Sequence, residues 1–324
     1  MNTINKKTAY ELQFEACPPL IKKFLLYNST IQGKSYQTVK TYYYDIKSFL
    51  IFLIKFKGLS PTDSDNPDLS LVTVEFLNNI SDQDIYEYLY YCQKDLHSSP
   101  ATRSKHVSAI REYFNYLYKH ERIIDANPAE DIQKPKLAKR LPKYLTEEQT
   151  YQLLKAVDGP YKERDYCIMV IFLNCGLRIS ELVGLNYSDI KKNNTMVIHG
   201  KGNKERSLYL NEACKRTLEQ YKAVRPVDGV KDKDALFLSR QGNRIHPDTV
   251  RYIIEKALKK SGLSGLGITC HKLRHTAATL MYKKGVDIRT LQEILGHESL
   301  DTTRIYTHIS NEQMKKALEK NSIG

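Results

Sequence analysis

The chain has 324 residues, of which 41% are hydrophobic and 27% charged, and its formal net charge is +13. This composition excludes a disordered or fibrous protein, and the length favours two domains that can each bury a core. Lysines and arginines are spread along the whole chain. The charge therefore indicates a long surface for a polyanion, most commonly nucleic acid. A soluble basic protein without such a partner is the competing interpretation.

The six cysteines include no CxxC pair and no histidine-rich neighbours at metal-ligand spacing. The sequence therefore predicts reduced core thiols and no metal site. The first residues contain no apolar signal segment, and no apolar run approaches the roughly 18 residues of a membrane span. We therefore expect a cytoplasmic protein.

After a flexible lead-in at residues 1–15, the sequence predicts a helical domain at residues 16–130. Apolar residues recur at helical spacing between residues 18 and 57, which favours two helices. The stretch at residues 58–70 is rich in Gly, Pro, Ser and Asp and is typical of a loop. Residues 71–77, LVTVEFL, alternate like a strand but fit a loop leading into a helix equally well.

Two further helices of this domain have clear start signals. Ser81 can act as an N-cap, and Asp84 places an acid in the first turn. Ser99 can cap the other helix, and Pro100 can occupy its first position. The apolar face expected for that helix comprises Val107, Ile110, Phe114 and Leu117. The first domain is therefore expected to be a compact bundle of four or five helices.

Several basic residues of this domain are candidates for contact with DNA. Arg103, Lys105 and His106 lie near the helix start after Ser99, where unpaired backbone N–H groups favour phosphate. Lys40 lies beside a cluster of tyrosines. A solvated helix face is the competing interpretation of these residues.

A basic linker is expected at residues 131–143. Between Asn127 and Tyr144 the sequence has three prolines, five lysines or arginines and no apolar periodicity. Such a composition is typical of an extended tether. The linker could lie along a nucleic-acid backbone, although a merely soluble connection explains it too.

The second domain is expected at residues 144–310. A capping box begins at Thr146, an apolar stretch ending at Gly176 predicts a buried helix, and Arg178 starts the next helix. The segment TMVIHGKGNKERSLYLN alternates around a Gly-rich turn, which predicts a β-hairpin with Lys201 at its tip. The fold class is therefore mainly α, with a helical first domain and an α-rich second domain that contains a small antiparallel β-hairpin.

Further basic residues and a tail complete this domain. Lys204 and Arg206 flank the hairpin tip, and Arg251 lies on a predicted helix. Their basic character fits contacts with phosphate and a solvated surface equally well. The tail at residues 311–324 predicts a short amphipathic helix whose apolar stripe packs on a neighbouring protomer.

The second domain carries groups suited to phosphoryl transfer without a metal. Its acids near the motifs, such as Glu181 and Asp301, are isolated, whereas a metal-dependent nuclease needs several carboxylates around magnesium. No Walker-type GxxxxGK[ST] motif is present. Fixed cations must then stabilise the charge of a pentavalent phosphate. The planar guanidinium forks of Arg178 and Arg274 suit its oxygens.

Tyr306 is the candidate nucleophile. A tyrosine has a pKa of about 10 and needs a nearby base or a cationic field to attack at neutral pH. His271 could accept its proton. Lys201 could protonate the departing deoxyribose oxygen as general acid, and His297 would donate to the scissile phosphate or hold it in line.

The motifs GLRISELVGL, GKGNKER, HKLRH and LGHESLDTTRIYTH together resemble those of the tyrosine recombinase (phage integrase) family, and most closely its bacterial Xer-type members. The resemblance covers about residues 20–310. The set is specific because an arginine, a hairpin lysine, HxxR, a histidine and a tyrosine occur in this order. Six positions match the family pattern: Arg178, Lys201, His271, Arg274, His297 and Tyr306.

The resemblance implies that the first domain is a core-binding domain and the second a catalytic domain, which together form a C-shaped clamp around duplex DNA at a specific recombination site. It implies a tetramer on two such sites, a 3′-phosphotyrosyl intermediate and a Holliday junction. No cofactor is implied, because the phosphotyrosine stores the bond energy. A second copy, a paralogous recombinase and a DNA translocase are the protein partners that it suggests.

Alternatives remain within and beyond the family. The absence of a long additional N-terminal arm-binding domain favours a Xer enzyme that resolves chromosome or plasmid dimers over the integrase of a mobile element or phage. A type IB topoisomerase shares similar chemistry, and a DNA-binding factor without chemistry is disfavoured by the complete set of six residues. His275 and His308 are expected to pack or cap.

Overall fold

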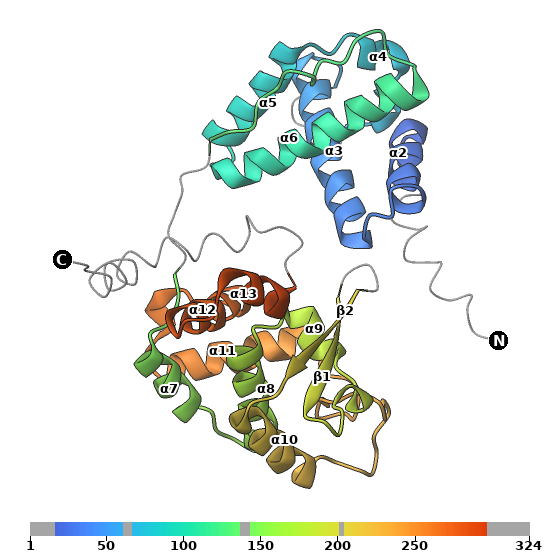
Figure 1. The fold of residues 1–324 in the computed structure, drawn as a ribbon. Helices are drawn as coiled ribbons and strands as arrows, with labels where there is room; N and C mark the ends of the chain where they lie inside the picture. Colours follow the sequence, from blue (N-terminus) through green and yellow to red (C-terminus); the bar gives the residue numbers. More distant parts are fainter. Residues whose placement is uncertain (1–16, 61–66, 137–142, 201–203, 297–324) are drawn as a thin grey trace, which may run out of the picture. The chain divides into compact units, whose positions relative to one another are not determined.

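The computed structural model describes residues 17–60, 67–136, 143–200 and 204–296. The chain divides into two compact units, Met1–Lys139 and Arg140–Gly324, and Figure 1 shows the elements of each. The lead-in at residues 1–15, the tail at residues 311–324 and most of the predicted linker's second half lie outside the described residues.

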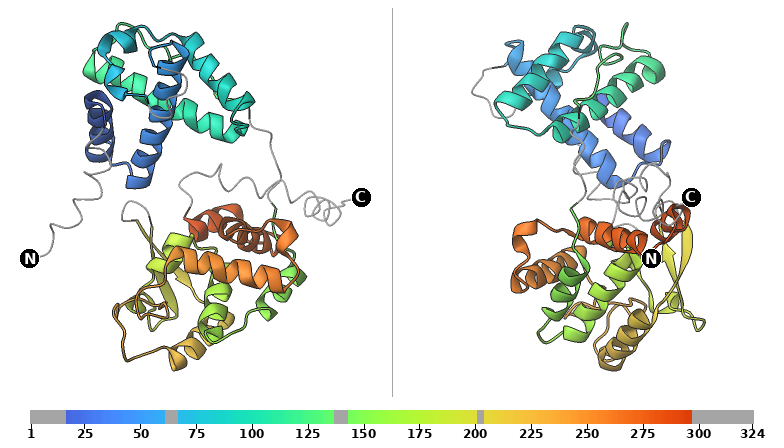
Figure 2. Two further views of the ribbon diagram at one scale, coloured as in Figure 1. Left: turned by 180° about the vertical axis from the view of Figure 1, so that it is seen from behind. Right: turned by 60° about the vertical axis from the view of Figure 1, so that its left-hand side comes forward.

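The described residues of the first unit form five α-helices, one 3-10 helix and one π-helical segment. Their bounds are α2 (Pro19–Thr30), α3 (Tyr36–Phe56), η1 (Leu69–Leu71), α4 (Val74–Asn78), α5 (Asp82–Lys94), α6 (Pro100–Asn115) and the π-helical η2 (Tyr116–Glu121). The long α3 packs against α2, α5 and α6 (Figure 2). Its apolar face belongs to this unit's core. The predicted helical bundle is confirmed.

Local signals account for where these helices begin. Ser81 and Asp84 form a capping box at the start of α5, and Ser99 accepts a hydrogen bond from the Thr102 N–H at the start of α6. Residues 71–77 do not form a strand. Thr73 caps the short helix α4 instead, so tertiary packing overrides the local alternation, as it often does for short apolar runs.

The described residues of the second unit surround one buried helix. The elements are α7 (Glu147–Lys155), α8 (Lys162–Cys175), α9 (Ile179–Gly184), η3 (Tyr187–Asp189), β1 (Thr195–His199), β2 (Glu205–Tyr209), α10 (Glu212–Val224), α11 (Pro247–Lys260), η4 (Ser264–Leu266), α12 (Cys270–Lys283) and α13 (Ile288–Leu295). The helix α8 contacts α7, α10, α11 and α12, so the run from Cys167 to Leu173 is buried on every side. It ends at Gly176, whose φ of +59° favours glycine.

The β-hairpin is a two-stranded antiparallel sheet in which Ile198 pairs with Arg206. Met196, Ile198 and Leu208 turn into the core, as the period of two requires. The fold class predicted from the sequence, mainly α with a small antiparallel sheet, is confirmed. Along the stretches that the structure describes, no helix combines the length and apolarity needed to cross a membrane.

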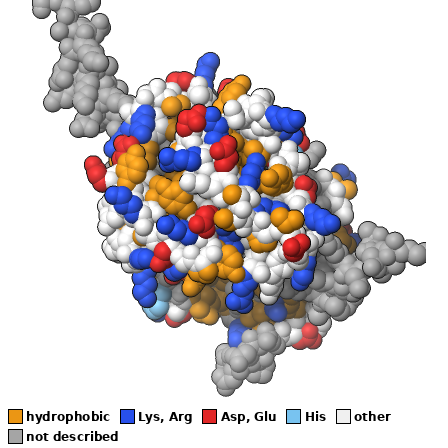
Figure 3. All heavy atoms as spheres, turned by 90° about the horizontal axis from the view of Figure 1, so that it is seen from below, with side chains coloured by type: hydrophobic (Ala, Val, Ile, Leu, Met, Phe, Trp, Pro, Cys, Tyr) orange, Lys and Arg blue, Asp and Glu red, His pale blue; other side chains and the backbone are white. Residues whose placement is uncertain are grey.

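The face of the molecule drawn in Figure 3 can be compared with the basic surface expected from the sequence. Figure 3 shows lysines and arginines interspersed there with acidic and apolar side chains. This face therefore carries no continuous basic patch, and the net positive charge does not by itself identify it as a DNA surface.

Two adjacent leucines of α2 provide a matched test of the first core. Leu25 is 2% exposed and Leu26 is 49% exposed. We expect Leu25→Ala to lower the free energy of unfolding by about 2–5 kcal/mol because it leaves a cavity, and Leu26→Ala to change it by less than about 0.5 kcal/mol. Urea unfolding of the full chain, followed by circular dichroism, measures both. Equal losses in the two variants would contradict this packing.

Candidate active site

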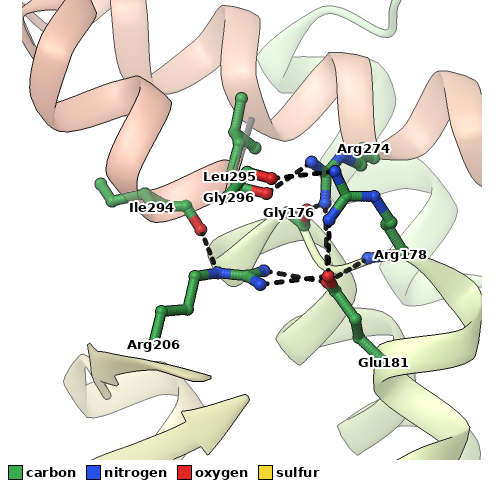
Figure 4. A network of polar contacts seen from close by, with 8 residues as sticks. All are labelled: Gly176, Arg178, Glu181, Arg206, Arg274, Ile294, Leu295 and Gly296. Carbon is green, nitrogen blue, oxygen red and sulfur yellow. Dashed lines mark hydrogen bonds and ion pairs between the residues drawn. The ribbon is translucent and has the colours of Figure 1, made fainter. Parts of the chain in front are cut away.

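Among the described residues, three arginines from three elements converge on the carboxylate of Glu181 (Figure 4). Arg178, the N-cap of α9, donates from Nη1 to Oε1 at 2.7 Å and from its backbone N–H to Oε2 at 2.8 Å. Arg206 on β2 donates from Nη1 to Oε1 at 3.0 Å and from Nη2 to Oε2 at 2.9 Å. Arg274 on α12 places Nη1 3.6 Å from Oε2. One acid thus orders three cations.

Glu181 is buried, with 5% of its surface exposed. Burial alone would raise the pKa of its carboxyl, but the hydrogen bonds and charges of Arg206 and Arg178 outweigh burial, and the net pKa lies below the ordinary value. The carboxylate is therefore ionised at neutral pH. Three guanidinium charges against one carboxylate give this cluster a net charge of +2.

The same three arginines hold the C-terminal end of α13. Arg206 Nε donates to the Ile294 carbonyl at 2.9 Å, Arg274 Nη2 to the Leu295 carbonyl at 2.6 Å, and Arg178 Nη2 to the Gly296 carbonyl at 2.9 Å. The last carbonyls of a helix lack partners within the helix and carry its negative dipole end. Cations are therefore the favoured partners for them.

Arg178 and Arg274 differ in access to solvent. The Arg178 side chain is 43% exposed, whereas that of Arg274 is 3% exposed and also donates to the Gly176 carbonyl at 2.8 Å. A phosphate that approached from solvent would therefore meet Arg178 first. Arg178 thus combines an ion pair with Glu181 and an edge that solvent can reach.

Two histidines one helical turn apart lie on α12 near the arginines. The Nε2 atoms of His271 and His275 are 3.1 Å apart and their rings are perpendicular, with an interplanar angle of 81°. Burial, with the charges of Arg274 and Arg178, lowers the pKa of His271. Burial, with the charges of His271 and Arg274, lowers the pKa of His275 to about 4. Both rings are therefore neutral at pH 7, so one donates a hydrogen bond to the other.

The structure thus brings Arg178, Arg274 and His271 together, three of the six candidate catalytic residues. Lys201, His297 and Tyr306 lie outside the described residues. Lys201 belongs to the connection between β1 and β2, and His297 directly follows Gly296 at the end of α13.

The candidate DNA-binding residues of the first unit have different surroundings. Lys105 is exposed on α6, whereas Arg103 is half-buried and donates to the Ser98 carbonyl. Lys40 is half-buried and lies over the Tyr44 ring. His106 is not on a solvated helix face, because its side chain is 14% exposed and lies between the Tyr88 ring and the Asp45 carboxylate.

In the second unit, Lys204 is exposed beside the hairpin connection, and exposed Arg251 pairs with Asp248. Arg206 departs from the expectation of a hairpin surface residue. Its side chain is 15% exposed, and its guanidinium is directed at Glu181 and the Ile294 carbonyl.

Sequence reasoning missed the central place of Glu181 and the partnership of His275 with His271. A signal existed for Glu181, because it lies three residues after an N-cap, the spacing at which a glutamate reaches back to the cap N–H. A signal for His275 was its position four residues after His271, on the same helix face.

Known proteins are similar to this chain over most of its length. The profile of the phage integrase family matches residues 143–313. A tyrosine recombinase XerC of Caldanaerobacter subterraneus subsp. tengcongensis is 45% identical over 324 residues, covering 99% of this chain and 92% of the relative. The XerC of Chlamydia trachomatis serovar L2 is 36% identical over 303 residues, covering 90% of this chain and 94% of the relative.

Solved structures share the fold. The XerH site-specific recombinase bound to palindromic difH substrate, a post-cleavage complex, superposes with a TM-score of 0.70 at 24% identity, covering 92% of this chain and 94% of that chain. A lambda integrase dimer bound to a COC′ core site gives a TM-score of 0.65 at 20% identity, covering 87% and 94%. With the family profile and the full-length relatives, the chain belongs to the phage integrase family and is a Xer-type site-specific tyrosine recombinase.

Proposed function

We propose that this recombinase cuts DNA by attack of the Tyr306 hydroxyl on a phosphate held by Arg178 and Arg274. The observation that carries the proposal is the cluster in which these two arginines and Arg206 surround Glu181 with a net charge of +2, beside a neutral His271. Guanidinium groups keep their protons at any physiological pH and match phosphate oxygens in pairs. They can therefore stabilise a pentavalent phosphate without a metal.

One bond forms and one breaks in the proposed cleavage step. The Tyr306 oxygen forms a bond to phosphorus, the bond from phosphorus to the deoxyribose O5′ breaks, and a 3′-phosphotyrosine remains. His271 takes the phenol proton, and Lys201 gives a proton to the departing O5′. His297 donates to the phosphate. Reversal by the 5′-hydroxyl of another strand rejoins the DNA, because the phosphotyrosine conserves the bond energy.

The proposed partner is duplex DNA with a specific recombination site, bound by several copies of the chain. Supporting observations are that the XerH structure contains difH substrate, and that lambda integrase forms a dimer on a COC′ core site and a tetramer on a Holliday junction. Residues 16–130 would act as the core-binding domain, residues 131–143 as the linker and residues 311–324 as a helix on a neighbouring protomer. A paralogous recombinase or a DNA translocase would be an additional partner.

The proposed cellular role is the resolution of chromosome or plasmid dimers. The full-length similarity to XerC proteins supports it over the integrase of a mobile element or phage.

Replacing the nucleophile provides the most direct test. We expect wild-type protein to form a covalent complex with a nicked cognate site and Tyr306→Phe to form none, because phenylalanine has no oxygen to attack phosphorus. Denaturing gel electrophoresis of labelled DNA measures the complex. As a matched control, Tyr151→Phe changes a 58% exposed tyrosine of α7 and should keep the band. A band of normal intensity with Tyr306→Phe would refute the assignment.

Removing one arginine should affect the rate far more than binding. Arg178→Ala should slow covalent complex formation by roughly 10²–10³, the loss seen when one donor to a developing oxyanion is removed. DNA affinity should change little, because many other phosphates are contacted. Arg178→Lys keeps the positive charge but lacks the planar pair of donors, so its rate of covalent complex formation should lie between those of the wild type and Arg178→Ala. Loss of DNA binding by Arg178→Ala would instead indicate a structural role.

The pH dependence should report His271. A general base must be neutral. In the protein without DNA, burial and the charges of Arg274 and Arg178 lower the pKa of His271 below the ordinary histidine value of 6.5. The second-order rate constant for covalent complex formation should therefore fall only as the pH drops below 6.5. At saturating DNA the fall in rate at low pH should begin at a higher pH, because a bound phosphate stabilises the imidazolium form and raises the pKa of His271. Retention of the low-pH limb in His271→Gln would contradict this role.

A further inference from the structure

Arg206 links three elements of the second unit that meet at the candidate active site. It extends from β2, grips both carboxylate oxygens of Glu181 on α9, and donates from Nε to the Ile294 carbonyl at the end of α13. Every one of these contacts joins residues at least 25 positions apart in sequence. Since the side chain is 15% exposed, its interactions are less screened by water than those of a surface pair.

The charge of Arg206 matters because both Arg206 and Arg178 can balance the charge of Glu181. Arg206 faces the carboxylate with two parallel hydrogen bonds, whereas the Arg178 side chain donates to Oε1 only. The paired geometry is the stronger of the two. If Arg206 neutralises Glu181, the charges of Arg178 and Arg274 remain for a phosphate.

The position of Arg206 also connects the segments that carry two other candidate catalytic residues. Its strand neighbour Ile198 lies on β1, which leads into the connection that contains Lys201. On the other side, a Cβ placed on Gly296 would lie 2.9 Å from Arg206 Nη1, so the guanidinium packs directly against the residue before His297. One side chain therefore fixes the base of the hairpin relative to the end of α13.

We propose that Arg206 is a positioning residue for strand cleavage: it balances the charge of Glu181 and holds the C-terminal end of α13, so that the positive charges of Arg178 and Arg274 act on the scissile phosphate. The proposal rests on the roles given above to these two arginines and Tyr306. In this role Arg206 acts through Glu181 and α13 and not by contact with the reacting atoms.

The first test removes the charge while retaining much of the side-chain length. Arg206→Met should slow covalent complex formation on a nicked site by roughly 10- to 100-fold, the range seen for residues that orient metal ligands, with DNA affinity unchanged. Arg216→Met, at an exposed arginine of α10, is the matched control and should retain the wild-type rate. A wild-type rate in Arg206→Met would overturn the proposal.

A second substitution separates positioning from a general effect on folding. In Arg206→Met the negative charge of Glu181 is balanced by Arg178 and Arg274 alone, which weakens their attraction for phosphate. Adding Glu181→Gln to Arg206→Met should therefore raise the rate of covalent complex formation again. A role in folding alone predicts the opposite, a double variant that is slower and melts lower than Arg206→Met. That result would overturn the proposal.

Arg206→Lys covers the case in which Arg206→Met does not fold. Lysine keeps the charge but cannot reproduce the paired bonds to Glu181 and the bond to Ile294 together, so cleavage should be slower than in wild type at normal DNA affinity. A wild-type rate would overturn the proposal. The inference fails alone if Tyr306→Phe abolishes the covalent complex while the Arg206 variants cleave normally. A persistent complex in Tyr306→Phe would show that the underlying assignment has failed.

Discussion

The carboxylate of Glu181 is the constraint on which the candidate active site depends. A buried charge is costly unless it is paired and hydrogen-bonded, and here the pairing comes from residues on α9, β2 and α12. Each arginine also occupies one of three consecutive carbonyls at the end of α13. Four separate elements are thereby fixed around one anion. The surrounding core, with α8 buried at its centre, provides the rigid support that such an arrangement needs.

The sequence predicted much of the fold because its signals were local. Ser81, Ser99 and Thr146 cap helices as expected, and the alternation around the GKGNKE turn became the β-hairpin. The short run at residues 71–77 was ambiguous because alternation over so few residues fits a strand and a helix start alike. Its outcome was decided by burial of Phe76 and Leu77 in the first core.

The site was only partly predictable for the opposite reason. The motifs identified Arg178, Arg274 and His271, which the structure brings together, but no local pattern states which acceptor an arginine will find. The sequence presents Arg206 as one basic residue of a hairpin, whereas the structure directs it at Glu181 and Ile294, 25 and 88 positions away. His106 similarly looked like part of a solvated helix start, although Tyr88 and Asp45 enclose it. Long-range contacts of this kind follow from the folded arrangement of elements and not from spacing along the chain.

The contacts that Arg178 makes within the protein have a consequence for selectivity. Each of its two terminal nitrogens gives an N–H to an acceptor within the protein, Glu181 for one and the Gly296 carbonyl for the other. These two contacts set the plane of the guanidinium before any phosphate arrives, so its further N–H groups have fixed directions. A free phosphate ion gains little beyond this one arginine, whereas a phosphate within a duplex arrives with many other contacts already made. A preordered guanidinium therefore favours a correctly seated DNA strand over small anions.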